Sequence, residues 1–465
     1  MKRQVMDSLV TWKKSQNRSF LLLRGAARVG KTWILKEFGE QEFTSSAYIS
    51  FRHNRRMERL FEGDLSPQLL LQCFEMEAGV PIKADTLLIL DDVEYIPGAA
   101  SALVRLSAQK PEYAIVAACS TRNSSAVGEA LFPVRKVDIL DMYPMTFMEF
   151  LEASAEGRLL YALKIHNFDL LHVFGDKLLD LLRKYLFVGG MPEAVRAYIK
   201  TGDPAAVRCV QKRILDDIVR EDFAKAPRVI SKKLSGIWES IPDQLVSGNR
   251  RFLFTRIRKG ARAEEFGKPL MWLSDAGLVL SVPRTENVGI PLMAPDNCLA
   301  YRLFYLDVGL LGAACGAGKT AELPGERESQ GEAELPGERE SQGAAELPGE
   351  AEIQGNAGLV SLDGPLLRQY VCQEMTAAGF PELFFWSAVN SIGDVDFLFE
   401  SAGFVVPIEV QAKENLKAKN LKSFCDRFRV GKSMRFSASD YRDETFLTNV
   451  PLYAIGWMAE FPKKK

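Results

Sequence analysis

The chain has 465 residues, enough for about two to four domains that each bury a core of their own. Its 59 Lys and Arg nearly balance its 60 Asp and Glu, and the formal net charge of -1 excludes a global field that would steer the whole chain toward nucleic acid. The seven cysteines include no C-x-x-C pair, which argues against a disulfide framework and a structural zinc site. No apolar run approaches the ~18 residues of a membrane span, so we expect a cytoplasmic protein without a membrane partner.

The first predicted strand and helix flank a turn that contains two glycines. Residues 20–23 are a short apolar run suited to a buried parallel strand, and residues 31–41 carry apolar side chains at helical spacing. The turn GAARVGKT at 25–32 fits the pattern G-x-x-x-x-G-K-[ST] in the strand-to-helix context of a phosphate-binding loop. This context disfavours the alternative of a chance match.

The positions of this loop have expected roles in binding ATP. Successive backbone N–H groups would point at phosphate oxygens, and the helix N-terminus would add partial positive charge. Lys31 would reach the β- and γ-phosphates, and the Thr32 hydroxyl would be a ligand of Mg²⁺. The loop residues predicted to bind the nucleotide are Gly25, Arg28, Val29, Gly30, Lys31 and Thr32.

A second acidic element follows in TLLILDDVEYIP, residues 86–97. This apolar strand ends in Asp91, which we expect to hold Mg²⁺ through a water and so to belong to the nucleotide site. Asp92 or Glu94 would position the attacking water. Further apolar strands and helices alternate with these elements and predict a doubly wound parallel sheet. Ser120 ends a strand expected between the two motif strands, and it would either sense the γ-phosphate or cap a helix.

The middle of the chain is predicted to be predominantly helical. The stretch CVQKRILDDIVREDFAKA, at 209–226, has apolar residues on one helical face, and PLMWLSDAGLVLSVPR indicates a helix followed by a wing-like hairpin after Gly277. A winged-helix-like arrangement is therefore expected. The basic segment RRFLFTRIRKGAR, at 250–262, would contact a nucleic-acid backbone or form a solvated surface.

Residues 321–356 are three tandem copies of a twelve-residue unit rich in Glu, Gly and Pro. Such a segment has too few large apolar groups to offset the entropy of ordering it, so we expect a disordered linker over 312–357. The Gly-Lys-Thr at 318–320 is not a second phosphate loop, because Ala313 stands where the first glycine of the pattern is needed.

The C-terminal stretch alternates like a sheet and then forms a basic amphipathic helix. Asp396 and Glu409 lie on two predicted strands and would share a divalent ion with Glu374 from a preceding helix. This is the D…E-x-K layout of restriction-endonuclease-like folds, with Gln411 in place of the lysine. An amide neither carries charge nor takes up a proton, so we expect binding without cleavage unless Lys413 reaches back along its strand.

As a group, these motifs resemble a family of prokaryotic P-loop ATPases with an N-terminal AAA-type domain and a C-terminal domain of unknown function with a nuclease-like fold. The resemblance covers nearly the whole chain and implies ATP binding. Where the family typically has Arg-Gln, Asp-Glu and Lys, this chain has Ala27-Arg28, Asp91-Asp92 and Gln411. The motifs that carry the resemblance are RGAARVGKTWILKEFG, TLLILDDVEYIP, FPVRKVDILDMYPMTFMEFLEA, YLFVGGMPEAV, ILDDIVREDFAK, YLDVGLL, FFWSAVNSIGDVDFLFE and PIEVQAKENLKAKNLKSF.

The predicted fold class is α/β. We expect a P-loop AAA-type domain over 1–150, a helical and winged-helix-like region over 151–311, the linker over 312–357, and an α/β nuclease-like domain over 358–465. The predicted function is an ATP-hydrolysing switch, with ATP and Mg²⁺ as cofactors, that couples nucleotide state to the C-terminal domain.

Two alternatives to this function stay open. One is a nucleic-acid-binding protein or metal-dependent nuclease gated by ATP, and the other is an interaction scaffold that binds ATP without turnover. Partners to expect are a nucleic acid, a second copy of the chain or another protein. A nucleic-acid partner is suggested by four basic residues that follow Glu409 in the sequence: Lys413, Lys417, Lys419 and Lys422.

Overall fold

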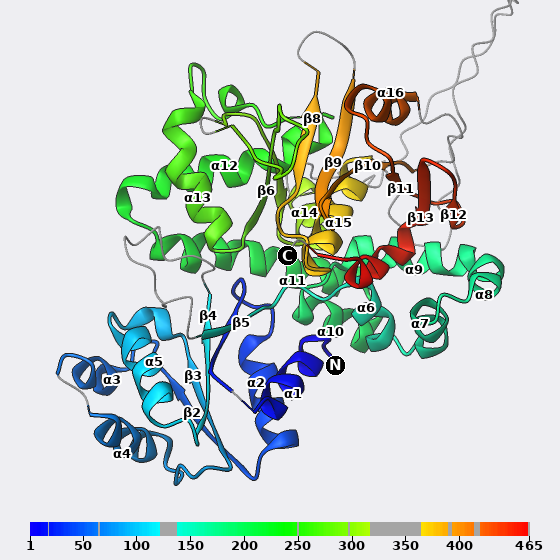
Figure 1. Ribbon diagram of the computed structural model, residues 1–465. Helices are drawn as coiled ribbons and strands as arrows, with labels where there is room; N and C mark the ends of the chain where they lie inside the picture. The colour runs from blue at the N-terminus through cyan, green and yellow to red at the C-terminus, as the bar shows by residue number, and fades with distance from the viewer. Residues whose placement is uncertain are drawn as a thin grey trace, which may run out of the picture.

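Three parts follow one another along the chain in Figure 1: a blue to cyan N-terminal part, a green helical part, and a yellow to red C-terminal part. The tandem repeat at 321–356 lies outside the described residues, as do Lys413 and Lys417. Within the described residues, no helix is both long and apolar enough to span a membrane. The structure is a computed structural model that describes residues 1–16, 18–63, 66–120, 137–248, 251–295, 298–316, 364–388, 393–412 and 419–463.

The N-terminal part is a parallel five-stranded sheet with the strand order β2-β3-β4-β1-β5. This sheet confirms the predicted doubly wound fold and places β4 between β1 and β3, as expected. Its elements are α1 (Val5–Lys14), β1 (Phe20–Arg24), α2 (Lys31–Glu42), β2 (Ser45–Ser50), α3 (Arg55–Leu60), α4 (Pro67–Ala78), β3 (Thr86–Asp91), the 3-10 turn Val93–Tyr95, α5 (Ala99–Gln109), β4 (Ala114–Cys119) and β5 (Val137–Asp141).

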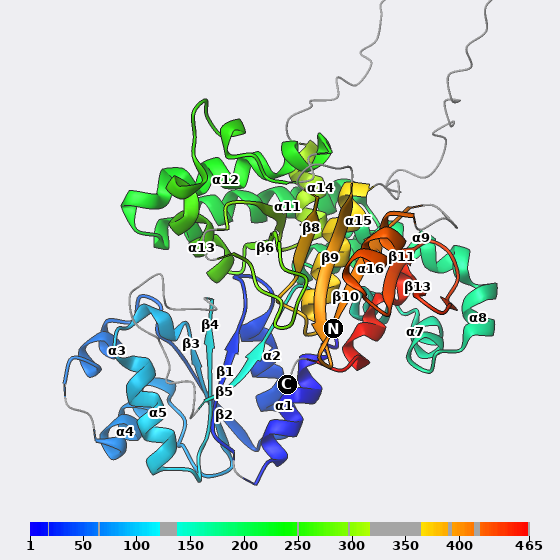
Figure 2. The ribbon, with the colours of Figure 1, turned by 45° about the horizontal axis from the view of Figure 1, so that its top comes forward.

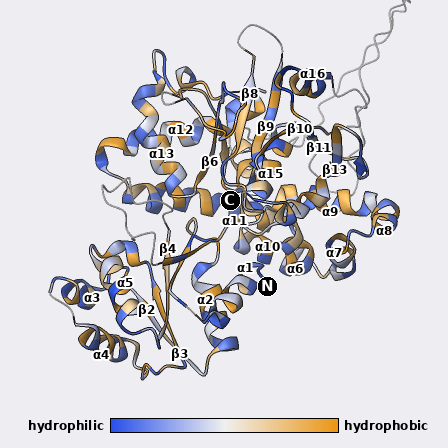
Figure 3. Ribbon diagram, viewed as in Figure 1, coloured by the Kyte–Doolittle hydropathy of each residue, from blue (hydrophilic) through white to orange (hydrophobic). Residues whose placement is uncertain are grey.

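Both faces of this sheet are buried. On β1, Leu21 and Leu23 pack in the cluster that includes residues of α1 and α2, whereas Phe20 and Leu22 pack with residues of α4 and α5. Successive strand residues point to opposite faces, which explains why the strand is a continuous apolar run. Figure 3 shows hydrophobic residues concentrated in strands such as β3 and hydrophilic residues on outlying helices such as α3.

The middle part is predominantly helical, as predicted. The regular helix α11 ends at Asp217 and continues as a π-helical turn, Ile218–Asp222, so the predicted helical segment contains an irregular turn. Its helical elements are α6 (Phe147–Ala153), α7 (Gly157–Lys164), α8 (Phe168–Val173), α9 (Gly175–Val188), α10 (Pro192–Thr201), α11 (Pro204–Asp217), the π turn Ile218–Asp222, the 3-10 turn Phe223–Lys225, α12 (Arg228–Val246), the 3-10 turns Phe254–Arg256 and Ala263–Phe266, α13 (Gly267–Asp275) and α14 (Val308–Gly316).

After Gly277 the middle part has two strands, β6 (Val279–Pro283) and β7 (Tyr301–Tyr305), which pair antiparallel. The expected hairpin strands therefore exist, but residues 284–300 lie between them in the chain, and the winged-helix arrangement stays a prediction. Helix α14 runs to Gly316, so it includes the first residues of the predicted linker.

The C-terminal part is a six-stranded sheet in the order β12-β13-β11-β10-β9-β8. The two strands predicted to carry Asp396 and Glu409 are β9 and β10, and they are antiparallel neighbours, whereas β10 pairs with β11 and β11 with β13 in parallel. Its elements are α15 (Gly364–Ala377), β8 (Phe384–Ser387), β9 (Asp394–Ser401), β10 (Phe404–Val410), α16 (Lys419–Phe428), β11 (Ser433–Ser437), β12 (Arg442–Asp443), β13 (Leu447–Pro451) and a final 3-10 helix, Leu452–Glu460.

One hydrophobic core joins the three parts. Leu35 of α2, Leu182 of α9 and Phe397 of β9 belong to the same buried cluster. In the views of Figures 1 and 2 the middle and C-terminal parts lie side by side above the N-terminal sheet. The loop after β1 contacts the middle part directly, since Arg28 and Asp222 form an ion pair. This packing places the loop at the boundary between the sheet and the helical part.

Candidate nucleotide-binding site

The loop between β1 and α2 needs glycine at two of its positions. A Cβ atom on Gly25 would lie 2.1 Å from the carbonyl oxygen of Met142, which no side chain can tolerate. Gly30 has φ +101°, a left-handed conformation that favours glycine. Arg28 is also left-handed, with φ +67°. The loop thus has the tight backbone curl expected of a phosphate-binding turn.

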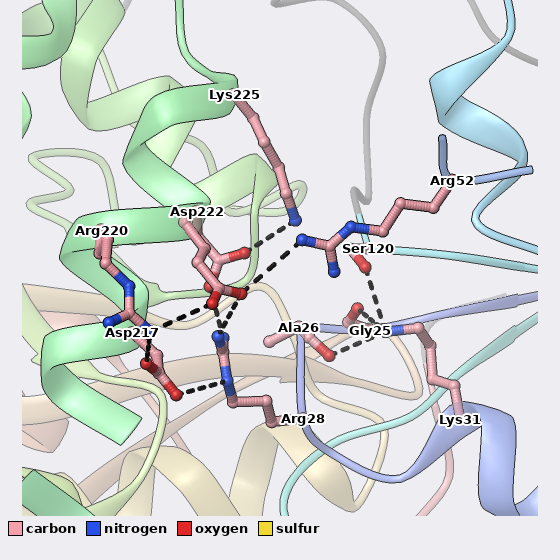
Figure 4. A network of polar contacts seen from close by, with 11 residues as sticks. Gly25, Ala26, Arg28, Lys31, Arg52, Ser120, Asp217, Arg220, Asp222 and Lys225 are labelled. Carbon is pink, nitrogen blue, oxygen red and sulfur yellow. Dashed lines mark hydrogen bonds and ion pairs between the residues drawn. The ribbon is translucent and has the colours of Figure 1, made fainter. Parts of the chain in front are cut away.

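Lys31 is buried against this loop, with 7% of its surface exposed. Its Nζ atom donates to the carbonyl oxygens of Gly25 and Ala26, both at 2.9 Å, and lies 3.4 Å from the hydroxyl of Ser120. Burial lowers the pKa of Lys31, and the Coulomb attraction of nearby acids, Glu94 first, opposes that shift. The ammonium group is therefore held between the loop and the end of β4, as Figure 4 shows.

Thr32 and Asp91 join the two motifs that the sequence singled out. The Thr32 hydroxyl donates to Asp91 Oδ2 at 2.6 Å, and the Tyr48 hydroxyl donates to the same oxygen at 3.1 Å. The backbone N–H of Asp92 donates to the other oxygen of Asp91 at 3.0 Å. A hydroxyl and a carboxylate in contact are oxygen ligands of the kind that Mg²⁺ prefers.

Asp92 and Glu94 differ in their surroundings. Asp92 is left-handed, with φ +59°, and burial followed by repulsion from Asp91 raises its pKa. Glu94 Oε1 accepts a hydrogen bond from the backbone N–H of Ser120 at 2.9 Å, and burial raises the pKa of Glu94. Its Oε2 atom is buried and has no hydrogen-bond partner within the described part of the chain. A buried oxygen without a partner is a place for a water molecule or a ligand.

The residues present fit ATP with Mg²⁺. The loop curls as a phosphate-binding turn does, Lys31 is the cation at its base, the oxygens of Thr32 and Asp91 would suit a metal ion, and Glu94 has a buried oxygen without a partner among the described residues. Ser120 lies beside Lys31 and Glu94, at the end of the strand between the two motif strands. The structure thus places Lys31 beside Ser120, Ser120 beside Glu94, and Thr32 beside Asp91, whereas the Arg28 side chain turns to the middle part.

Acidic residues of the middle part bind the Arg28 side chain, a contact that the sequence did not predict. Asp222 and Glu221 accept hydrogen bonds from the Arg28 guanidinium at 2.8 and 3.0 Å. The only signal in the sequence was the charged motif ILDDIVREDFAK, and nothing in its spacing names a partner 194 residues away. Figure 4 shows this network between the loop and the middle part.

One family comparison covers the part of the chain that holds this site. Residues 17–151 match a family described as an AAA domain. This part of the chain has the AAA-type P-loop fold. Residues 179–321 and 363–455, which follow the AAA-type domain, match two families described as domains of unknown function, DUF8612 and DUF4143. No curated protein matches the chain. The predicted nuclease-like fold of the C-terminal part stays a prediction.

Solved structures similar to the chain include three proteins of low sequence identity. The Holliday junction branch migration motor RuvB of Thermotoga maritima is 12% identical, covers 62% of this chain and 90% of its own, and has a TM-score of 0.27. Drosophila ORC bound to DNA is 13% identical, with 60% and 87% covered and a TM-score of 0.27. C. elegans PCH-2 is 14% identical, with 45% and 68% covered and a TM-score of 0.26.

The metal site predicted beyond the AAA-type domain is not assembled as expected. Glu374 has 2% of its surface exposed, and its Oε1 atom accepts hydrogen bonds from the backbone N–H of Phe147 at 2.9 Å and the Tyr185 hydroxyl at 3.3 Å. Helix α15 therefore turns this carboxyl toward helices α6 and α9 of the middle part. Among the residues that the structure describes, no group of three or more His, Cys, Asp or Glu side chains is arranged to hold a metal ion.

The other two predicted metal ligands have basic partners. Asp396 accepts a hydrogen bond from the backbone N–H of Val410 at 2.9 Å and lies 3.6 Å from Arg302, and Glu409 pairs with Arg435 at 3.1 Å. Both carboxylates line a cavity of about 190 Å³, together with Gln411. Their charge is thus already balanced by arginines, which weakens the case for a divalent ion there.

Proposed function

We propose that the chain binds ATP with Mg²⁺ in the P-loop and hydrolyses it. The observation that carries this proposal is the 2.6 Å contact between the Thr32 hydroxyl and Asp91, because it unites the two motifs around one metal position. Lys31 would hold the β- and γ-phosphates, while the backbone of Gly25, Arg28, Val29 and Gly30 would surround them. Thr32 and Asp91 would hold Mg²⁺, which would supply positive charge to neutralise the phosphates.

Glu94 is the better candidate to position the attacking water, with Asp92 as the alternative. The proposal is supported by the buried Oε2 atom of Glu94, which has no hydrogen-bond partner among the described residues, and by its contact with Ser120. Asp92 lies next to the metal-binding Asp91 but has a shorter side chain than the glutamate typical of the resembling family. Ser120 would sense the γ-phosphate from the end of β4.

The test is binding and turnover by the purified full chain. Calorimetry should detect Mg-ATP binding to the wild-type chain and none to Lys31→Ala, with the exposed Lys83→Ala as the matched control. Phosphate release should depend on Mg²⁺ and be lost with Lys31→Ala. Unchanged affinity in Lys31→Ala would contradict the binding site, and binding without release would favour the scaffold function over hydrolysis.

We propose that ATP binding at the P-loop changes the structure of the C-terminal part through contacts with the middle part. The contacts that support this path are the Arg28–Asp222 ion pair and the hydrogen bond from Phe147 to Glu374. The proposal predicts that ATP changes the protease sensitivity of the C-terminal part. An identical digestion pattern with and without Mg-ATP would contradict it.

A second candidate function is nucleic-acid binding through the middle part. The basic segment predicted from the sequence presents exposed Arg256, Arg258, Lys259 and Arg262, which favours contacts with a phosphate backbone. Anisotropy titrations with single- and double-stranded DNA and RNA, repeated with Mg-ATP and at rising salt, would test it. If Lys259→Ala and Arg262→Ala bind nucleic acid with the same affinity as the wild-type chain, the basic segment is only a solvated surface.

A further inference from the structure

Three carboxylates of the middle part surround the guanidinium group of Arg28 on the P-loop. Arg28 Nη1 donates to Asp222 at 2.8 Å and Nη2 to Glu221 at 3.0 Å, and Nε lies 3.8 Å from Asp217. Arg52, which follows β2, also lies 3.7 Å from Glu221. Figure 4 shows Asp217 and Asp222 reaching from one helical segment toward Arg28.

The π-helical turn explains how one segment presents these acids together. In a regular α-helix, positions 217 and 221 share a face, but position 222 would point about 140° away from position 217, at 100° per residue. Hydrogen bonds from i to i+5 widen the turn at Ile218–Asp222. Asp217, Glu221 and Asp222 can therefore all meet Arg28. Such turns are frequent at functional sites.

Asp222 also holds a second cation. Its Oδ1 atom accepts a hydrogen bond from Lys225 Nζ at 2.8 Å, while its Oδ2 atom accepts the bond from Arg28. The Lys225 ammonium lies 5.8 Å from the ring centre of Tyr95, the residue after Glu94. Asp222 has 5% of its surface exposed, so its two charge-assisted bonds are little screened by water.

We propose that Asp222 is a positioning residue for ATP, which holds Arg28 on the P-loop and Lys225 beside the turn that carries Glu94. This inference rests on the proposed function of the P-loop. The left-handed conformation of Arg28 is unfavourable for a residue with a Cβ atom, so it needs support from its side chain. Asp222 supplies that support from another part of the chain, and it thereby links nucleotide binding to the position of the middle part.

Substitution of the carboxylate provides the first test. Asp222→Asn keeps the shape but removes the charge that holds both cations, so it should lower Mg-ATP affinity about fivefold or more. Asp222→Glu keeps a carboxylate and should recover most of the affinity. Asp216→Asn is the matched control, because Asp216 is exposed on the same helix, and it should bind as the wild-type chain does. Melting temperatures of all variants should stay close to that of the wild-type chain.

A double-mutant cycle provides the sharper test, with calorimetric Mg-ATP affinity as the readout. If Asp222 acts through Arg28, the effect of Asp222→Asn should fall to about twofold or less in an Arg28→Ala background. Additive effects of the two substitutions would overturn the proposal, as would affinity in Asp222→Asn equal to that of Asp216→Asn. A lowered affinity that follows a lowered melting temperature, without recovery in Asp222→Glu, would assign Asp222 a merely structural role.

The cycle measures binding and not turnover, so its failure is distinguishable from failure of the proposed hydrolysis. If the wild-type chain binds Mg-ATP but releases no phosphate, the proposed hydrolysis is wrong. The double-mutant cycle, which reads only affinity, still tests the role of Asp222. A wild-type chain that does not bind Mg-ATP would overturn both proposals.

Discussion

Single residues in this protein gain their roles from burial as much as from charge. Glu374 shows this most clearly: burial raises its pKa to about 8, while the backbone N–H of Phe147 donates a hydrogen bond to it. In the folded chain this carboxyl keeps its proton at pH values where it is ionised in the unfolded chain. We therefore expect Glu374 to be a pH-sensitive contact between the middle and C-terminal parts.

The sign of the resulting pH dependence follows from linkage. Between about pH 4.5 and pH 8 the folded chain binds the proton of Glu374 and the unfolded chain does not, so stability should fall as pH rises. Glu374→Gln cannot titrate and should reduce this fall, by an amount on the order of a few kcal/mol. Urea unfolding of both chains at pH 5 and pH 8 measures it. Equal pH dependence in the two chains would contradict the raised pKa.

The water-positioning role also belongs to a single side chain. We expect Glu94→Gln to lower phosphate release about 100-fold while Mg-ATP affinity changes little, because a positioning group acts mainly in the transition state. Asp92→Asn is the parallel variant. Single-turnover measurements on both variants decide between them: if Asp92→Asn stops release and Glu94→Gln does not, the two roles are exchanged.

At the scale of elements, the strand-to-helix turns determine which glycines are replaceable. Gly25→Ala should abolish Mg-ATP binding, since its new Cβ atom would lie 2.1 Å from a backbone oxygen and would displace the P-loop. Gly157→Ala is the control, because a Cβ there meets no atom within 4 Å at the start of α7. It should leave binding unchanged and stabilise the chain slightly. Calorimetry and thermal unfolding of both variants measure this contrast.

At the scale of the whole molecule, one core runs through all three parts, although the sequence between α14 and α15 contains a long repetitive segment. Deleting 321–356 should leave thermal stability and ATP turnover nearly unchanged, because closing a loop costs only about 0.6 kcal/mol per doubling of its length. Comparing melting temperature and phosphate release between the two chains tests this. A melting temperature lowered by many degrees would show that the repeat packs against the rest of the chain.

The sequence alone determined the parts of this protein that depend on neighbouring residues. The phosphate loop at 25–32, the acidic strand end at Asp91 and the alternation of strands and helices are local patterns, because glycine conformations and apolar periodicity act over a few residues. The paired strands β9 and β10 were predictable for the same reason. Even the contact between Thr32 and Asp91 followed from the motifs, since the carboxyl ends of parallel strands share one edge.

Only the tertiary structure decided which distant charges meet. Glu374 accepts hydrogen bonds from the Phe147 backbone and the Tyr185 hydroxyl instead of lying beside Asp396, because packing buries the face of α15 that carries Glu374. Arg28 meets Asp222 because a π-helical turn and the docking of the middle part bring them together across 194 positions. Spacing along a chain sets which residues share an element, but the relative placement of elements is set by the sum of many weak apolar contacts, which no single motif encodes.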